Sequence, residues 1–389
     1  MRQPWVKVLP FLFLLVLGVV HAVFGAGAAL DLGFQSGSGA NGTILKMILQ
    51  TDGKILIAGY FSAYDGTARA GLARLNPDGQ LDPDFVPGAY SWDFSFVHVQ
   101  SDGKVLIGSS LTRRLNTDGS IDNSYNPVGV GFFNAHVLGV QSDGKLVRFL
   151  STRPGTSGSY HTERLTGSGA LDYSFNPIVS PFMDGGGSGG GTFVDRFDFG
   201  SVGPDDSIIA GGTYCQRMLQ HGLNDSGFSG AAYVSMIVRQ PDERILIVVT
   251  SSVLPPFAPP KGVSRLLANG QLDSTFAPIR TGSQNVRAIA LQNDGKILVG
   301  LAASGSGSNT ISRFNPDGTG DSSFESPPLF DGPINAMVVL PTGKILVAGA
   351  FTNVNGVAQN RIAQLDPDGL SSPSIASQPE SQSVTGAAM

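Results

Sequence analysis

The most informative stretch of this chain reads Arg74-Leu75-Asn76-Pro77-Asp78-Gly79-Gln80-Leu81-Asp82-Pro83-Asp84-Phe85. Its pattern, Arg-x4-Gly-x2-Asp-x2-aromatic, occurs six times with identical spacing, ending at Phe85, Tyr125, Phe175, Phe228, Phe276 and Phe324. Four residue types do not keep the same offsets by chance, so the chain is built from repeats of one structural unit.

The middle of this pattern predicts a three-residue hairpin loop. Pro77 suits the second position of a type I turn, and Gly79 suits the left-handed position that follows it. Counting outward from the loop places Arg74 opposite Asp82 on the neighbouring strand. We expect a partly exposed cross-strand ion pair here, contributing less than about 1 kcal/mol.

A second turn motif lies between the copies of the first. It is intact as Asp-Gly-Lys at Asp52, Asp102, Asp143 and Asp294, and degenerate at Asp205, Asp242 and Thr342. Each copy precedes an apolar run such as Ile55-Leu56-Ile57-Ala58, which is typical of a strand buried on both faces. The intervals of 37 to 62 residues are close to the roughly 40 to 50 residues of a four-stranded propeller blade. We therefore predict a seven-bladed β-propeller, with the aromatic residues filling the spaces between blades.

The seventh copy of the first motif is divided between the chain ends. Gln364 to Gly369 supplies the first half, and Leu30-Asp31-Leu32-Gly33-Phe34 supplies the Asp-x-x-aromatic half. We expect the N-terminal strand to complete the last blade and so to close the ring without an open edge.

Composition agrees with an all-β chain. The 52 Gly and 24 Pro residues, with only 14% charged residues, favour many short strands and tight turns, so we expect almost no helix.

Residues 1–28 have the features of a secretory signal peptide: Arg2 and Lys7 precede an apolar stretch from Val8 to Val20, and cleavage is expected between Ala22 and Ala28. The alternative is an uncleaved anchor. After cleavage we expect a secreted or cell-surface protein with no membrane span.

Charge and cysteine content limit the partners. The whole sequence has a net charge of −5, and loss of Arg2 and Lys7 makes it more acidic, which argues against nucleic acid or an anionic membrane. Cys215 is the only cysteine, so no intrachain disulfide can form. We expect a monomeric domain stabilised by packing alone.

The two motifs together, Gln-x-Asp-Gly-Lys-Ile-Leu and Arg-Leu-Asn-x-Asp-Gly-x-Leu-Asp-x-x-Phe, resemble the delta-60 repeat, an uncharacterised β-propeller family of bacterial exported proteins. The resemblance covers about residues 30 to 370 and weakens in the fourth and fifth blades and at Thr342. It implies the fold and the compartment. Because the family has no established activity, it implies no site residues.

These observations divide the chain into a signal peptide (1–28), a propeller (29–370) and a short C-terminal segment (371–389). The segment Pro373-Ser374-Ile375-Ala376-Ser377-Gln378-Pro379 is similar to the first strand of bacterial immunoglobulin-like domains. It is either the start of such a domain or a short disordered tail.

No residue pattern indicates catalytic, cofactor or metal chemistry. Calcium is the cofactor to consider, because the loop from Asn76 to Asp82 is rich in oxygen ligands, but Arg74 occupies the first ligand position and would repel the ion. Cys215 lies close in sequence to His221, although a single thiol in an irregular connection is more often incidental. The remaining histidines of the mature chain fall at non-equivalent repeat positions: His98, His136 and His161.

Three irregular segments are candidates for ligand recognition. They are the glycine run Gly185 to Gly191, which has no P-loop context, the proline-rich segment Leu254 to Pro260, and Tyr90-Ser91-Trp92. Insertions on one rim of a propeller commonly carry specificity, so a glycan or protein ligand is expected at these rim loops; the alternative is that they are plain connectors.

We therefore expect a non-enzymatic extracellular binding or spacer module of a larger bacterial cell-surface or adhesin-like protein. The alternative is a secreted propeller hydrolase or lyase with its site at the mouth of the central channel. That alternative requires several His, Glu or Asp side chains to converge from different blades.

Overall fold

The computed structural model describes residues 28–88, 94–108, 112–128, 134–151, 160–176, 179–180, 197–212, 215–231, 233–250, 259–303, 309–324 and 327–367. Within these residues all regular structure is β, with no helix, which confirms the predicted all-β class. The predicted signal peptide, apart from Ala28, and the segment 371–389 lie outside the described residues.

The described strands form seven antiparallel sheets of three or more strands and one separate hairpin. The first strands of the sheets are β2 (Thr43–Leu49), β7 (Val97–Val99), β10 (Asn134–Val140), β14 (Phe197–Val202), β17 (Val234–Arg239), β20 (Asn285–Leu291) and β24 (Ile334–Val339). The second strands are β3 (Ile55–Tyr60), β8 (Val105–Ile107), β11 (Leu146–Ser151), β15 (Ile208–Gly212), β18 (Ile245–Val249), β21 (Ile297–Ala302) and β25 (Ile345–Gly349). The third strands are β6 (Leu72–Leu75), β9 (Arg113–Leu115), β12 (Tyr160–Leu165), β16 (Gln216–Met218), β19 (Gly262–Leu266), β22 (Asn309–Phe314) and β28 (Ile362–Asp366).

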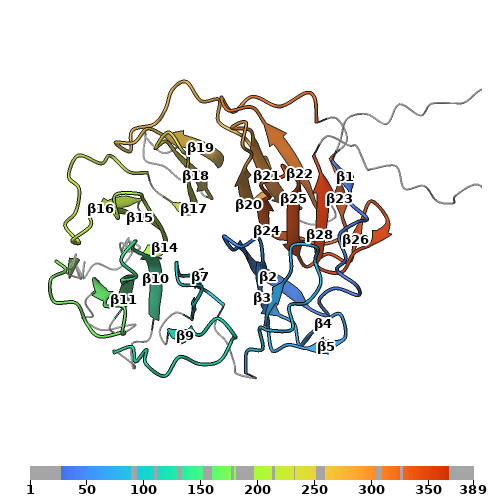
Figure 1. Ribbon diagram of the computed structural model, residues 1–389. Helices are drawn as coiled ribbons and strands as arrows, with labels where there is room; N and C mark the ends of the chain where they lie inside the picture. The colour runs from blue at the N-terminus through green and yellow to red at the C-terminus, as the bar shows by residue number, and fades with distance from the viewer. Residues whose placement is uncertain are drawn as a thin grey trace, which may run out of the picture.

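The sheets are arranged around a common centre, with the first strand of each nearest to it (Figure 1). The second strands are buried on both faces, as predicted; Ile55 and Ile57 are fully buried. Each sheet is named below by its first strand.

Clusters of buried apolar side chains lie between neighbouring sheets. Seven such clusters occur in the described part of the chain, and each takes side chains from two sheets that follow one another. One of them joins the β24 sheet to the β2 sheet through Leu346, Ile44 and Phe34. The predicted position of the aromatic residues is confirmed, since Phe85, for example, packs between the β2 and β7 sheets.

The two ends of the sheets differ. Leu49 pairs with Ile55, and Ile55 pairs with Leu75, so both predicted hairpin turns lie at the same end, here called the turn rim. Thr43 pairs with Tyr60 at the opposite end, here called the loop rim, where longer connections begin.

The predicted hairpin and its register are confirmed. Asn76 donates its backbone N–H to Gln80 at 2.8 Å, Gly79 has a φ of +94°, and Asp82 donates its backbone N–H to Arg74 at 2.8 Å. In all six copies the Arg Nε lies 2.6 to 2.9 Å from the Asp carboxylate. The same guanidinium lies 4.6 to 5.2 Å from the centre of the aromatic ring. These three side chains are called the clasp.

Each clasp also reaches the next sheet. The Arg Nη1 donates to a backbone carbonyl in the turn of the following repeat at 2.5 to 3.4 Å, from Arg74 to Thr117 in the first copy and from Arg313 to Pro367 in the last. The cation of the second turn motif adds to the pair, as Lys54 does at 2.8 Å from Asp82. The clasp therefore links strands within a sheet and also links neighbouring sheets.

The expectation of a partly exposed ion pair is wrong for the first copy, where Asp82 is 1% exposed and Arg74 is 8% exposed, because the turn of the next sheet covers the guanidinium. It is confirmed for the fourth copy, where the side chains of Arg217 and Asp225 are 24% and 17% exposed. Burial alone would raise the pKa of Asp82, but hydrogen bonds from Lys54 and Arg74 outweigh it and hold this pKa below its usual value.

In six of the seven sheets the predicted fourth strand is discontinuous. Next to the turn it is reduced to a single bridge, as between Leu75 and Leu81. The chain then turns, because Asp82 accepts the backbone N–H of Asp84 at 3.0 Å, and the aromatic ring enters the space between sheets. Pairing resumes toward the loop rim through β13 (Val179–Ser180) and β23 (Leu329–Phe330).

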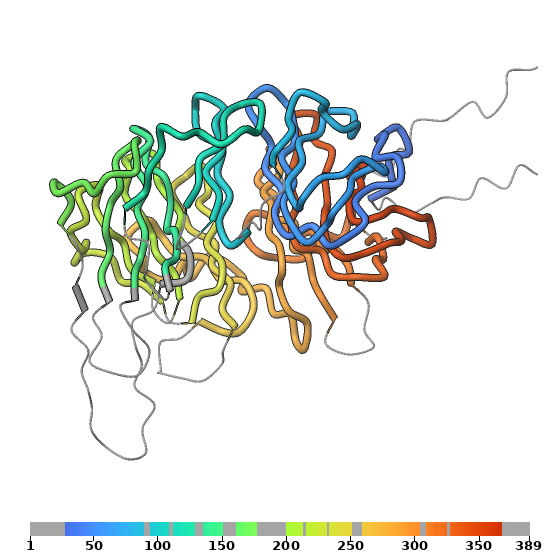
Figure 2. The backbone as a smooth tube through the Cα atoms, turned by 90° about the horizontal axis from the view of Figure 1, so that it is seen from below, coloured from blue at the N-terminus to red at the C-terminus, as the bar shows by residue number. Residues whose placement is uncertain are grey.

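The chain ends meet in one sheet. The strand β1 (Ala29–Leu30) pairs with β28, which places Leu30 opposite Leu365, and the two ends of the described chain lie side by side in Figure 2. Asp31 accepts hydrogen bonds from Lys344 and Gln364, both at 2.6 Å. Gln364 thus takes the place that Arg has in the other six copies.

Two short hairpins were not predicted. They are formed by β4 (Ala63–Tyr64) with β5 (Thr67–Ala68) and by β26 (Asn353–Val354) with β27 (Val357–Ala358). The second one pairs with β23 of the β20 sheet. Their Asp-Gly and Asn-Gly turns are the strongest local signal for a two-residue hairpin, so the sequence did contain the information.

Candidate functional site

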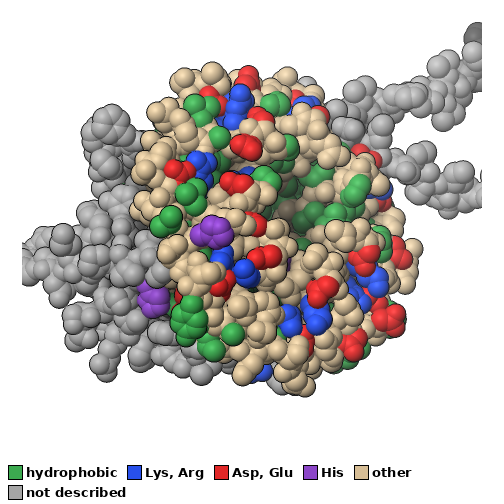
Figure 3. Space-filling model, turned by 60° about the vertical axis from the view of Figure 1, so that its left-hand side comes forward, with side chains coloured by type: hydrophobic (Ala, Val, Ile, Leu, Met, Phe, Trp, Pro, Cys, Tyr) green, Lys and Arg blue, Asp and Glu red, His purple; other side chains and the backbone are tan. Residues whose placement is uncertain are grey.

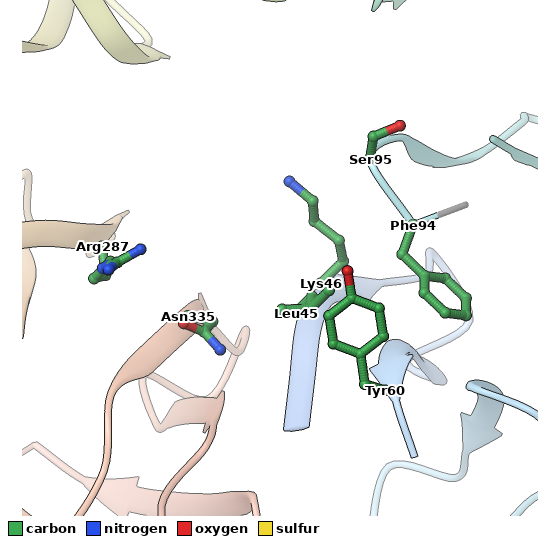
Figure 4. A pocket seen from close by; sticks show the side chains of 7 residues that line it. All are labelled: Leu45, Lys46, Tyr60, Phe94, Ser95, Arg287 and Asn335. Atoms are coloured by element: carbon green, nitrogen blue, oxygen red, sulfur yellow. The ribbon is translucent and has the colours of Figure 1, made fainter. Parts of the chain in front are cut away.

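A cavity of about 400 Å³ opens at the loop rim, where the first strands of several sheets begin. Figure 4 shows the side chains around it, which come from β2, β3, β20, β24 and the segment before β7: Leu45, Lys46, Tyr60, Phe94, Ser95, Arg287 and Asn335. It brings together residues from the β2, β20 and β24 sheets and from the segment before β7, so we take it as the candidate site.

A β-bulge places the side chains around this cavity. The pairing register shifts between Ile44 and Lys46 in β2, and at the corresponding points of β20 and β24. The residues inside these shifts are Leu45, Arg287 and Asn335. A bulge bends the strand and redirects its side chains, and here all three of these side chains line the cavity.

The cavity is electropositive. Lys46 and Arg287 point into the opening (Figure 4), and in the described part of the chain neither has an acidic partner within salt-bridge distance. Lys46 is exposed to solvent, and the protein that lines the opening lowers the pKa of its amine by partial desolvation. Elsewhere acidic and basic side chains stand next to one another around the hollow face in Figure 3, as in the clasps.

Polar and aromatic groups complete the site. Asn335 donates Nδ2 to the backbone carbonyl of Ile44 at 2.9 Å, which fixes the amide and leaves its Oδ1 as an acceptor. Tyr60 is 73% exposed, and its ring packs edge-on against the buried Phe94 ring at 6.3 Å. An exposed aromatic ring that is held in place by a second ring is a suitable surface for a flat or cyclic ligand.

The structure does not bring the titratable candidates together. His98, His136 and His161 lie on β7, β10 and β12, and His221 lies in a turn-rim loop. Cys215 is buried in the cluster between the β14 and β17 sheets, and burial raises the pKa of its thiol to about 12. Such a thiol stays protonated and is not a nucleophile at neutral pH.

Oxygen atoms of the loop from Asn76 to Asp82 form hydrogen bonds and ion pairs with nearby protein groups. Arg74, at the expected first calcium-ligand position, pairs with Asp82, and Asp78 accepts the backbone N–H of Gln80 at 3.0 Å. Across the residues that the structure covers, no three His, Cys, Asp or Glu side chains are grouped as a metal site requires.

The three irregular segments named from the sequence fall outside the described residues, except Pro259 and Pro260 at the end of the proline-rich one. The residues that flank them lie at the loop rim: Val249 pairs with both Val234 and Gly262, and Phe197 pairs with Gly212. The candidate loops therefore connect to the same rim as the cavity.

Sequence reasoning missed the cavity residues. Four of them occupy one repeat position, seven residues before the first residue of the second turn motif: Leu45, Ser95, Arg287 and Asn335. Because the residue type there varies among the repeats, and only Ser occurs twice, a search for recurring residues passes over this position. The usable signal was the opposite one, a position where the repeats differ although its neighbours are regular.

Comparison with known proteins supports the fold. Residues 50–85, 100–125, 292–324 and 340–370 match a family model described as a β-propeller domain of unknown function (DUF5122). These segments make up less than half of the chain and lie in the β2, β7, β20 and β24 sheets. The protein is thus an all-β propeller, with segments that match a propeller family without an assigned function.

Solved structures with some likeness are diverse. YCF48 bound to D1 peptide is 12% identical, with a TM-score of 0.46 and coverage of 87% of this chain and 95% of that chain. The Pan2 WD40 domain of Neurospora crassa is 9% identical, with a TM-score of 0.47 and coverage of 88% and 94%. A putative gluconolactonase is 12% identical, with a TM-score of 0.41 and coverage of 88% and 92%. These values are too low to carry an argument about function.

A search of curated proteins found no match. Over the described ranges, the structure has no helix with the length and apolar character needed to cross a bilayer.

Proposed function

We propose that the seven sheets are the blades of one ring, which the N-terminal strand closes by completing the last blade. The pairing of β1 with β28 supports this, as does the apolar cluster between the β24 and β2 sheets. Propellers that close in this way have no exposed sheet edge at the seam.

The proposed role is that of a non-enzymatic binding module in a larger bacterial cell-surface protein. The signal-peptide pattern of residues 1–28 supports export, and the delta-60 resemblance supports a bacterial exported origin. A following immunoglobulin-like domain would fit the pattern of residues 373–379.

The observation that carries the binding role is the loop-rim cavity. Its side chains come from separate sheets that are rigidly packed, and rigid elements hold a binding site more precisely than loops do. The lining combines aromatic rings with a few convergent polar groups, as ligand pockets generally do. Its titratable groups are Lys46, Arg287 and Tyr60, whereas the hydrolase alternative needs carboxylates or imidazoles there.

The proposal is tested by a binding screen of residues 28–370 against envelope polysaccharides, environmental polysaccharides and peptides, with calcium and with chelator. Saturable binding that is lost when Tyr60 and Asn335 are both replaced by alanine supports a recognition module. The matched control is the exposed Tyr173 on the turn rim, replaced by alanine, which should bind as the unaltered protein does. Binding that persists in the Tyr60/Asn335 variant would contradict the assigned site, and turnover of a bound glycan would favour the hydrolase.

A further inference from the structure

We infer that the loop-rim cavity binds an anionic sugar unit, a carboxylated ring of the uronic acid type within a polysaccharide. This inference rests on the proposed binding function and names the chemical class of its ligand.

The charge of the cavity differs from that of the rest of the protein. The chain as a whole is acidic, with a net charge of −5, and most of its cations are paired with carboxylates, as Lys54 and Arg74 are with Asp82. Lys46 and Arg287 differ, because two cations from separate sheets point into one hollow with no carboxylate partner in the described structure. A concave site lined by charges of one sign concentrates counter-ions of the other sign.

The two cations are also available to a ligand. Lys46 and Arg287 are exposed to solvent, and neither forms an ion pair or a hydrogen bond with any described residue. An incoming carboxylate would provide a charge-assisted hydrogen bond to the cation that it reaches. Arg287 and Lys46 lie on β20 and β2, with β24 between them, so they face the mouth from two sides.

The aromatic surface of the cavity favours a sugar over an acidic peptide. The exposed Tyr60 ring offers a flat apolar face, and an edge-on contact with Phe94 holds it in place. The Asn335 Oδ1 and the Tyr60 hydroxyl offer acceptors and a donor at the same cavity. A uronic acid ring matches all three features: its carboxylate pairs with a cation, its axial C–H groups cover the aromatic ring, and its hydroxyls reach the amide.

The test compares oligogalacturonate, its neutral methyl ester and poly-glutamate as probes, measured by isothermal titration calorimetry at low and moderate salt. Lys46→Met and Arg287→Met remove the charges and keep most of the side-chain length. Arg280→Met is the matched control, since Arg280 is an exposed cation outside the cavity with no acidic partner among the described residues. Circular dichroism of each variant checks that it is folded.

The expected result is saturable binding of oligogalacturonate that weakens with salt, with roughly tenfold or greater loss in Lys46→Met and in Arg287→Met and none in Arg280→Met. The methyl ester should bind much more weakly. Binding of the methyl ester with equal affinity would overturn the charge argument and leave the proposed function intact. Equal binding of poly-glutamate would overturn the sugar assignment. No binding of any glycan or peptide, here and in the wider screen, would contradict the binding function itself.

Discussion

Replacement of Asp82 by alanine removes the carboxylate that joins the first clasp. The carboxylate is 1% exposed and accepts from Arg74 at 2.6 Å and from Lys54 at 2.8 Å. Without it both cations remain in place, and the Arg74 guanidinium keeps only its bond to Thr117 and its contact with the Phe85 ring.

The size of the effect follows from the burial of the two cations. Removing one member of a buried ion pair typically costs about 3 to 5 kcal/mol, because the remaining charge is left without compensation. The Arg74 side chain is 9% exposed and cannot regain water, whereas that of Lys54 is 28% exposed and can turn outward. We therefore expect a loss near the lower end of this range, about 3 kcal/mol.

The assay is urea unfolding at neutral pH followed by circular dichroism, with Asp84→Ala as the control. Asp84 is exposed, lies two residues away and has no side-chain partner in the described structure, so its loss should cost less than about 0.5 kcal/mol. Equal unfolding midpoints for the two variants, with the same slope, would refute the view that the clasp is a buried and stabilising unit.

Three further predictions concern turns, pH and the thiol. Gly343→Ala should lower the free energy of unfolding by about 1 kcal/mol through backbone strain alone, because nothing lies within 4 Å of the new Cβ. Gly79→Ala should lower it distinctly more, because its Cβ would lie 2.7 Å from the Phe34 ring. Equal losses in urea unfolding would argue against close packing at the seam. Cys215 should react with a thiol reagent only as the protein unfolds, because burial raises its pKa to about 12, and immediate labelling of the native protein would contradict its position. Acid should also destabilise the fold, because the aspartates of the clasps and of the seam have folded-state pKa values below the unfolded value of about 3.9. The stability that they supply is complete above that pH and is lost as the pH falls through the folded values, so the urea midpoint should be steady from about pH 5 to 7 and drop below about pH 4. A midpoint unchanged down to about pH 3 would exclude this contribution from Asp31, Asp82, Asp122, Asp172, Asp225, Asp273 and Asp321.

The hairpin registers were predictable because local chemistry determines them. Pro77 and Gly79 allow only a few loop conformations, and the loop length then fixes which residues oppose each other, so the pairing of Arg74 with Asp82 followed directly. The burial of that pair was not predictable in this way. It depends on Thr117, which lies in the next repeat and covers the guanidinium only after the sheets have packed.

The candidate site was harder to predict for a related reason. Arg287 and Asn335 line the cavity because a bulge redirects them, and a bulge leaves no residue signature in a strand whose other positions are regular. The residues also come from distant repeats, so their convergence depends on how the sheets are arranged around their common centre. Sequence reasoning instead pointed to long loops, whose flanking residues do lie on the same rim.

The claim that the chain ends meet in one blade is tested most directly by a disulfide between Ala29→Cys and Asp366→Cys. These residues are directly opposite in the pairing of β1 with β28, where Cα atoms lie roughly 5.5 Å apart, within the range that a disulfide spans. The buried Cys215 should not interfere. If the N-terminal strand completes the last sheet, mild oxidation of the folded monomer should form an intramolecular bond, and the urea midpoint should be higher than in the reduced form. Cysteines that stay reduced, or that link only separate molecules, would contradict closure by the N-terminal strand.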